Sequence, residues 1–291
     1  MDAVEIYEKC VPSVVSIQAD GEGEYSTGTG VVMSADGYIL TNAHVVADSL
    51  RMSVLLSDGR VMEARLVGAD AGEDLAVLKV EASGLTPAEF GDSDRLRCGE
   101  MVVAIGDPLG YRTSITQGIV SALNRTVPVD GVELQVIQTS APINFGNSGG
   151  ALINQYGQVV GITTVKIVTD DGSAESLGFA IPSRRVKYVA DTLIAGKQVR
   201  RGIFGFTVLT RTAQGGGLTL DSVDKASDAY AQGLRAGDVL IAANGQSLNA
   251  VEDLVRLKQS LGAGDAVSLT YVRDGQSYTA SVALIDPDEQ T

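Results

Sequence analysis

The stretch INFGNSGGAL, residues 143–152, places three glycines around a single serine, Ser148. Glycine weakens strands and helices, so a chain gathers several of them where its backbone must turn sharply or be approached closely. Two arrangements would explain the pattern: a tight turn between strands, or a loop whose amide groups surround one hydroxyl. The rest of the sequence decides between them.

The composition restricts the classes of function. The chain has 291 residues, of which 44% are hydrophobic and 20% charged, and this suits one large domain or two smaller ones. Its net charge of −14 argues against binding to nucleic acid or to anionic lipid, because both attract basic surfaces. The first ten residues lack the basic and apolar regions of a signal peptide. We therefore expect a cytoplasmic protein, or a targeting segment that lies outside this sequence.

The two cysteines, Cys10 and Cys98, match no zinc or redox spacing. Two separate thiols are the favoured interpretation, and a single disulfide that ties the N-terminal segment to the body is the alternative. We expect neither a metal nor a cofactor.

Turn signals indicate a β-rich first part. Asp-Gly lies between alternating or apolar segments at three places, and Tyr-Gly at a fourth, each typical of a β-hairpin. These stretches are VVMSADGYILTNA (31–43), VLLSDGRVMEARLV (54–67), ALINQYGQVVGITTV (151–165) and LTYVRDGQSYTASVAL (269–284). Since most of residues 12–182 is of this kind, the sequence predicts an antiparallel barrel or sandwich there.

The pattern changes after residue 182. Ser183 can cap a helix, apolar residues then recur at helical spacing as far as Ile194, and Gly196 can end it. Further helix and strand signals follow. We therefore predict a first domain over residues 1–187, a linker over 188–200 and a small α/β module over 201–287.

His44, in ILTNAHVV, is the only histidine of the chain. A lone histidine in an apolar setting is more often a core residue than a catalyst. A serine nucleophile, however, needs a base of near-neutral pKa and a carboxylate that orients it. Asp74, in GEDLAVLKV, stands directly before an apolar strand; alone it would be interpreted as a turn residue.

The order of these three residues along the chain is informative. His44, Asp74 and Ser148 follow the order of chymotrypsin-type β-barrels, whereas the subtilisin and α/β-hydrolase orders belong to α/β sheets. The glycines around Ser148 would let the amides of Gly146 and Ser148 point at one oxyanion. The opening stretch is therefore interpreted as a loop that surrounds the hydroxyl.

Several blocks resemble the HtrA (Deg) family of trypsin-fold serine proteases. They are TNAHVV, DLAVLKV, IQTSAPINFGNSGGALIN and LGFAIPS, while GLRAGDVLIAANGQSL resembles a PDZ domain. The resemblance implies a mainly β protein, with a double six-stranded trypsin-like barrel followed by a small α/β PDZ domain. It makes His44 the general base, Asp74 the orienting carboxylate and Ser148 the nucleophile. The amides of Gly146, Asn147 and Ser148 would line the oxyanion hole.

The resemblance also implies two binding regions. The pocket for the residue before the cut would be built by Pro142, Ile143, Asn144, Thr163, Thr164 and Val165. No carboxylate is placed there to receive Lys or Arg, so an apolar residue is expected. In the PDZ domain, the amides of Phe204, Gly205 and Phe206 would capture a peptide's C-terminal carboxylate, beside a helix that bears Val251 and Leu254.

For the whole protein, the resemblance implies work on unfolded or misfolded proteins outside the cytoplasm, in trimers or larger assemblies. Ser140, Phe145 and Ala151 depart from the usual family pattern, which has aspartate at the first position and proline at the other two. A catalytically silent PDZ scaffold or chaperone is one alternative, which the intact triad argues against. An esterase is the other, and a peptide-binding domain favours protein substrates over it.

Overall fold

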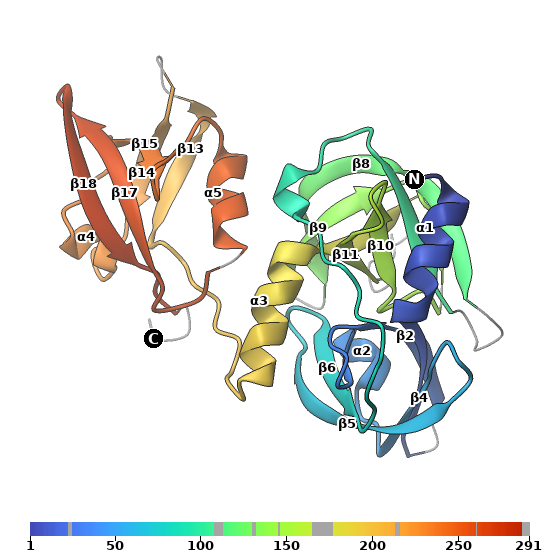
Figure 1. Ribbon diagram of the computed structural model, residues 1–291. Coiled ribbons are helices and arrows are strands. Elements are labelled where there is room, and N and C mark those ends of the chain that lie inside the picture. The colour runs from blue at the N-terminus through green and yellow to red at the C-terminus, as the bar shows by residue number, and fades with distance from the viewer. Residues whose placement is uncertain are drawn as a thin grey trace. The chain divides into compact units, whose positions relative to one another are not determined.

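The computed structural model describes residues 1–22, 25–107, 113–129, 132–144, 146–164, 177–212, 216–259 and 261–286. These residues belong to two compact units, Met1–Gln198 and Val199–Thr291. Each unit is drawn in Figure 1, in colours that run from blue at the N-terminus to red at the C-terminus.

The first barrel is closed by six antiparallel strands in the order β1-β2-β3-β6-β5-β4. They are β1 (Val14–Asp20), β2 (Tyr25–Val32), β3 (Tyr38–Thr41), β4 (Arg51–Leu55), β5 (Val61–Asp70) and β6 (Leu75–Val80). Gly37 and Gly59 have φ of 106° and 89° in the turns of two predicted hairpins, a conformation that favours glycine. A short helix, α2 (Ala43–Val46), follows β3.

The second barrel closes in the order β10-β11-β12-β9-β8-β7. Its strands are β7 (Met101–Gly106), β8 (Ser114–Val129), β9 (Val132–Thr139), β10 (Ala151–Asn154), β11 (Val159–Thr164) and β12 (Gly178–Pro182). Each barrel encloses its own cluster of buried aliphatic side chains. The predicted double six-stranded barrel is thus confirmed.

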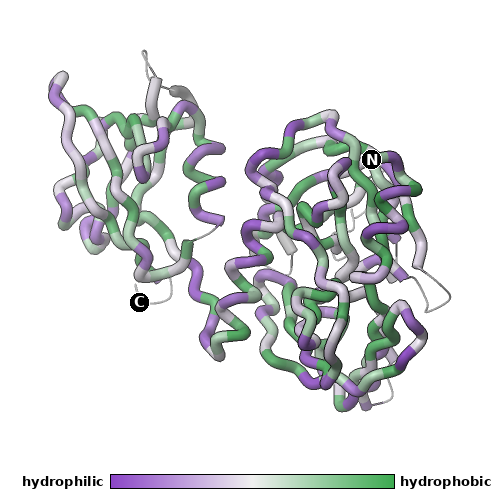
Figure 2. Tube along the Cα trace, in the orientation of Figure 1, coloured by the Kyte–Doolittle hydropathy of each residue, from purple (hydrophilic) through white to green (hydrophobic). Residues whose placement is uncertain are grey.

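Helix α3 (Ser183–Ile194) lies against both barrels, because it contacts β5 and β6 of the first and β11 and β12 of the second (Figure 1). Val186, Val189 and Leu193 are buried on one face. In Figure 2, α1, α3 and α5 alternate between hydrophilic and hydrophobic residues, as helices with one buried face do. The helix predicted as far as Ile194 is thus present, and residues 188–194, which the sequence also assigns to a linker, belong to the first unit.

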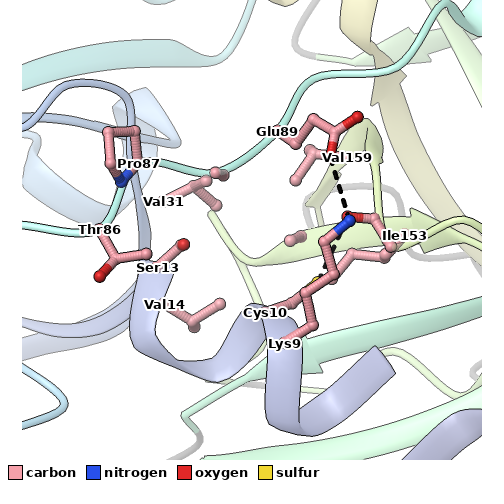
Figure 3. Close-up of a pocket in the computed structure, with 13 residues that line it drawn as sticks. Lys9, Cys10, Ser13, Val14, Val31, Thr86, Pro87, Glu89, Ile153 and Val159 are labelled. Atoms are coloured by element: carbon pink, nitrogen blue, oxygen red, sulfur yellow. Dashed lines mark hydrogen bonds and ion pairs between the residues drawn. The ribbon is translucent and has the colours of Figure 1, made fainter. Parts of the chain in front are cut away.

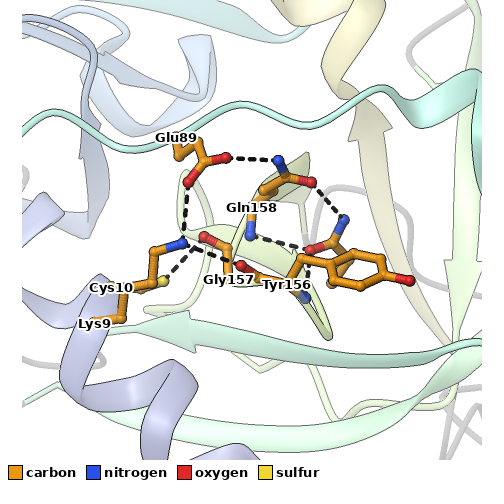
Figure 4. Close-up of polar contacts among 7 residues, drawn as sticks. Lys9, Cys10, Glu89, Tyr156, Gly157 and Gln158 are labelled. Atoms are coloured by element: carbon orange, nitrogen blue, oxygen red, sulfur yellow. Dashed lines mark hydrogen bonds and ion pairs between the residues drawn. The ribbon is translucent and has the colours of Figure 1, made fainter. Parts of the chain in front are cut away.

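The N-terminal helix α1 (Ala3–Cys10) is bound to the second barrel, although it precedes the first. Lys9 Nζ donates to the Glu89 carboxylate at 3.0 Å and to Tyr156 O at 3.1 Å, and Cys10 Sγ donates to Gly157 O at 3.4 Å (Figure 4). The side chains of Gln158 and Lys9 hold the pKa of Glu89 below its usual range. Helix α1 thus connects the two barrels. Single 3₁₀ turns follow it at Val11–Ser13 and precede β7 at Ser93–Arg95.

A cavity of about 240 Å³ lies beside α1 and is lined by residues of both barrels and of the segment between them. Figure 3 shows Cys10 among its lining side chains, with Val31 and Val159 across from it. Burial raises the pKa of the Cys10 thiol. Cys10 is buried, Cys98 is exposed and both are free, so the interpretation as two separate thiols is confirmed.

The second unit is a six-stranded antiparallel sheet in the order β13-β14-β15-β17-β18, with β16 paired to β15. Its elements are β13 (Phe206–Thr212), β14 (Leu218–Val223), α4 (Asp228–Ala231), β15 (Val239–Ala243), β16 (Gln246–Ser247), α5 (Val251–Lys258), β17 (Ala266–Arg273) and β18 (Gln276–Ala283). Strands β17 and β18 pair from Ala266 opposite Ala283 to Arg273 opposite Gln276, as the Asp-Gly signal predicts. Leu254 of α5 is buried in the core of this unit.

Candidate active site

His44 is oriented by Asp74. It lies in α2, and its ring Nδ1 is 2.8 Å from Asp74 Oδ1 and 3.0 Å from Oδ2. The His44 backbone N–H also donates to Asp74 Oδ1, at 3.2 Å. Because the carboxylate accepts the Nδ1 proton, Nε2 is the nitrogen that can accept a proton from a substrate or a nucleophile.

Asp74 is fully buried at the start of β6 and is held from several directions. Thr164, the last residue of β11, donates its hydroxyl to Asp74 Oδ2 at 2.9 Å. Asn42 Nδ2 donates to the Asp74 carbonyl at 2.9 Å. The Asp74 backbone has φ of 51°, in the left-handed region that aspartate tolerates better than most residues. The carboxylate is therefore fixed by partners from both barrels.

Ser148 lies between the barrels, in the loop before β10. Its carbonyl accepts from Thr29 N at 2.8 Å, and Gly149 N donates to Thr163 O at 2.9 Å. A Cβ on Gly149 would lie 2.1 Å from Thr29 O and 2.3 Å from Thr41 Oγ1, so only glycine fits. This close packing places Ser148 against the segment that leads into His44.

The loop that precedes Ser148 is supported from β2. The Thr29 hydroxyl donates to Gly146 O at 2.7 Å and accepts from Asp107 N at 2.8 Å. The Asn147 N–H donates to Asn144 O at 3.0 Å. The prediction of Asn147 as an oxyanion donor therefore needs correction, because its amide is used inside the loop. The amides of Gly146 and Ser148 remain the candidates.

The residues predicted for the substrate pocket are placed as follows. Pro142 and Asn144 are exposed, and Ile143 is half-buried and packs against the core of the second barrel. The Thr163 hydroxyl donates to Asn147 O at 2.5 Å, and that of Thr164 to Asp74. These two hydroxyls support the loop of Ser148 and the Asp74 carboxylate, a role that the sequence does not indicate. Val165 lies outside the described residues.

The five residues predicted for the PDZ site line one groove, of about 550 Å³, beside β13 and α5. Those residues are Phe204, Gly205, Phe206, Val251 and Leu254. The rings of Phe204 and Phe206 stack with centroids 5.1 Å apart. Gly205 has φ of 71°, and a Cβ there would lie 2.2 Å from Ser227 Cβ, so this bend requires glycine. Its carbonyl accepts from Asp224 N at 2.8 Å, which fixes the loop.

The described residues offer neither a metal cluster nor a membrane-spanning helix. No group of three or more His, Cys, Asp or Glu side chains among them could hold a metal ion. None of the helices they form has the length and apolar character needed to cross a membrane.

Two family profiles match the chain. One, described as a trypsin-like peptidase domain, matches residues 28–162, and the other, described as a PDZ domain, matches residues 202–284. The first match covers His44, Asp74 and Ser148, and the second covers the groove of the second unit.

The chain is similar to several curated proteases. It is 36% identical to "Serine protease Do-like HtrB" of Bacillus subtilis, over all of this chain and 71% of that protein. It is 40% identical to "Probable periplasmic serine protease do/HhoA-like" of Haemophilus influenzae, over 88% of this chain and 58% of that protein. A relative in Halomonas elongata, "Probable periplasmic serine endoprotease DegP-like", is also 40% identical, and the chain covers 61% of it. The chain thus spans about three fifths of the length of these last two relatives.

The structure is also similar to solved proteases. The structure titled "HtrA-type protease AlgW with tripeptide" matches with a TM-score of 0.75 and 33% identity, over 99% of each chain. The serine endoprotease from Yersinia pestis matches with a TM-score of 0.64 and 32% identity, over 98% of each chain. The sequence similarity, the double barrel and the PDZ-like sheet all match these proteases, and the chain belongs to the HtrA (Deg) family of serine proteases.

Proposed function

We propose that this protein is a serine endopeptidase that cleaves unfolded or misfolded proteins through His44, Asp74 and Ser148. The observation that carries the proposal is the buried Asp74 carboxylate, which binds His44 Nδ1 at 2.8 Å. Ser148, in a glycine loop packed on the segment before His44, supplies the hydroxyl. A base, its orienting carboxylate and a serine are the groups that acyl transfer requires.

The reaction would proceed in two halves. His44 Nε2 accepts the Ser148 hydroxyl proton as Oγ attacks the scissile carbonyl, and the imidazolium is stabilised by Asp74. The leaving amine then takes that proton from His44, and an ester of Ser148 remains. A water molecule, deprotonated by the same imidazole, hydrolyses the ester and restores the serine. In both tetrahedral intermediates the amides of Gly146 and Ser148 would donate to the oxyanion.

The test is cleavage of unfolded casein by the wild-type chain and by Ser148→Ala. Loss of the nucleophile should lower kcat by roughly 10⁶-fold. Thermal unfolding of the two chains should coincide, since alanine fits in place of serine. Cleavage that persists in Ser148→Ala would exclude the triad, and absence of cleavage by both chains would support the silent scaffold.

The residue before the cut should be apolar. The proposed pocket, at Pro142, Ile143 and Asn144, carries no carboxylate. We expect cuts after Val, Ala, Leu or Ile, with discrimination of about 1–3 kcal/mol per methylene group. Mass spectrometry of the casein fragments measures this preference. Cuts mainly after Lys and Arg would contradict it.

The groove of the second unit would bind peptide C-termini. The solved relative AlgW is titled as a complex with a tripeptide, which supports a peptide ligand in this family. The amides of Phe204, Gly205 and Phe206 would receive the carboxylate, and Val251 and Leu254 would contact its last side chain.

Calorimetric titration of the Ser148→Ala chain with peptides that end in an apolar residue tests carboxylate capture. Amidation of the peptide C-terminus should weaken binding by roughly 1.5–3 kcal/mol, the value of hydrogen bonds to a charged group. Equal binding of the acid and amide peptides would reject it.

We also propose an extracytoplasmic location, because curated relatives are named periplasmic proteases. Assembly into trimers or larger homo-oligomers is proposed from the family resemblance alone. Sedimentation of the purified chain would measure the assembly, and a monomer at micromolar concentration would contradict it.

A further inference from the structure

A buried ion pair lies next to the triad and takes no part in the proposed mechanism. Arg185 of α3 donates from Nε to Glu73 Oε2 and from Nη2 to Glu73 Oε1, both at 2.8 Å. Arg185 is 9% exposed and Glu73 is 7% exposed. A two-point contact of this kind fixes the position of a carboxylate as well as neutralising its charge. Glu73 directly precedes Asp74, so the pair holds the residue beside the triad's carboxylate.

The turn that ends at Asp74 needs an external support. Asp74 has φ of 51°, a backbone conformation that residues other than glycine seldom adopt. Within the turn, the Glu73 N–H donates to Asp70 Oδ1 at 2.8 Å, and the Asp74 N–H reaches Ala71 O at 3.4 Å. A small rotation of this turn would move the Asp74 carboxylate away from His44.

Helix α3, which carries Arg185, is held firmly enough to support this turn. Near the start of α3, Ser183 Oγ donates to Gly91 O at 2.7 Å, and the Arg184 N–H donates to Ser93 Oγ at 3.2 Å. The helix contacts β6, which begins after Asp74, and β11, which ends at Thr164. It therefore touches both strands that position the Asp74 carboxylate and its hydroxyl donor.

Asp70 interacts electrostatically with Arg185, and the Tyr188 ring centroid lies 4.9 Å from its guanidinium carbon. We propose that Glu73 and Arg185 are positioning residues for catalysis, which act by holding the Asp70–Asp74 turn so that Asp74 keeps its orientation toward His44. The proposal rests on the triad proposed above.

A double-mutant cycle on the full chain tests it, with a small activated peptide ester as substrate. The paired replacement Glu73→Gln with Arg185→Met removes both charges and keeps similar side-chain volumes. In the wild-type background it should lower kcat by about 10- to 100-fold, the effect of a displacement near the reacting groups, with KM changed by less than about twofold. In an Asp74→Asn background it should change kcat by less than about twofold, because the group that it positions is already lost.

Further variants keep the test independent of folding. Arg185→Met alone removes the two-point partner of a buried carboxylate and should destabilise the fold, so the replacement is made in both residues and the double variant is checked by thermal unfolding. Arg185→Lys keeps the charge but loses the two-point contact, and should show a smaller loss of kcat, again only when Asp74 is present. Asp238→Asn with Arg273→Met is the matched control, because Arg273 binds Asp238 with the same geometry in the second unit, at 2.6 and 2.7 Å. This control variant should keep kcat within about twofold of the wild-type value.

Equal losses of kcat in both backgrounds would overturn the proposal, since a pair that only stabilised the fold would lower kcat equally with and without Asp74. An unchanged kcat in the wild-type background would overturn it as well. The Ser148→Ala chain in the same assay separates this failure from a failure of the triad. Ester hydrolysis that survives in that chain would reject the triad itself, and the positioning role with it.

Discussion

The two halves of the proposed triad are held in different ways. In the first barrel, the Asp74 carboxylate, which has no exposed surface, binds the His44 ring and accepts from the Thr164 hydroxyl of β11. In the second barrel, the loop of Ser148 is held through its own backbone groups. Ser148 O accepts from Thr29 N, Gly149 N donates to Thr163 O, and the carbonyls of Gly146 and Asn147 accept from threonine hydroxyls.

Because of this difference, substitutions in the two halves should have different effects on rate and on stability. Side-chain contacts can be replaced by groups of the same size, so substitutions in the His44 half should change the rate and leave the fold intact. Backbone contacts depend on space and on φ, so substitutions around Ser148 should act through the fold. Three substitutions test this distinction.

Asp74→Asn should give the largest effect, a fall in kcat of roughly 10⁴-fold, because the amide cannot hold the imidazole in the required tautomer. Asparagine tolerates φ of 51°, so thermal unfolding should change little. Asp58→Asn, in the exposed turn between β4 and β5 of the same barrel, is the control and should retain the activity. More than about a tenth of wild-type kcat in Asp74→Asn would exclude this orienting role.

Gly149→Ala should destabilise the protein by about 3 kcal/mol, because the new Cβ collides with Thr29 O and Thr41 Oγ1. Gly59→Ala is a close control, since its φ of 89° resembles the 81° of Gly149 while no atom lies within 4 Å of its Cβ. It should cost only the strain of the left-handed backbone, about 1 kcal/mol. Chemical denaturation compares the two variants, and equal losses would show that space around the serine loop is not limiting.

Thr164→Val should have the smallest effect of the three. Valine has nearly the same shape and removes one donor from Asp74 Oδ2, so kcat should fall by about tenfold with KM little changed. Thr192→Val on α3, whose hydroxyl only donates to Tyr188 O, should leave kcat unchanged. If both variants behave alike in steady-state kinetics, the hydroxyl of Thr164 does not support the carboxylate.

Local signals explain what the sequence could predict. Asp274 and Gly275, with φ of 50° and 76°, form the last hairpin turn, and residues that tolerate positive φ identify such turns without knowledge of the fold. The candidate triad likewise follows from residue types and their order. Both the turn and the triad predictions depend on residue types that can be seen in short stretches of sequence.

The remaining features join distant residues and leave no local signal. The Arg185–Glu73 pair spans 112 residues, and the bond from Thr29 to Gly146 spans 117. The expected linker begins inside α3, because the packing of Leu193 on Gly68 of β5, which keeps this helix in the first unit, cannot be seen in the helix's own sequence. The amide of Asn147 was misassigned since the direction of an N–H depends on how the loop folds back.

The most direct test of the central claim, that His44 and Asp74 activate Ser148 as a nucleophile, is labelling with a fluorophosphonate probe followed by mass spectrometry. The wild-type chain should gain one adduct, located on Ser148, and the Asp74→Asn chain should react far more slowly. The Ser148→Ala chain should gain none. An adduct on another residue, or equal labelling of the wild-type and Ser148→Ala chains, would contradict the account.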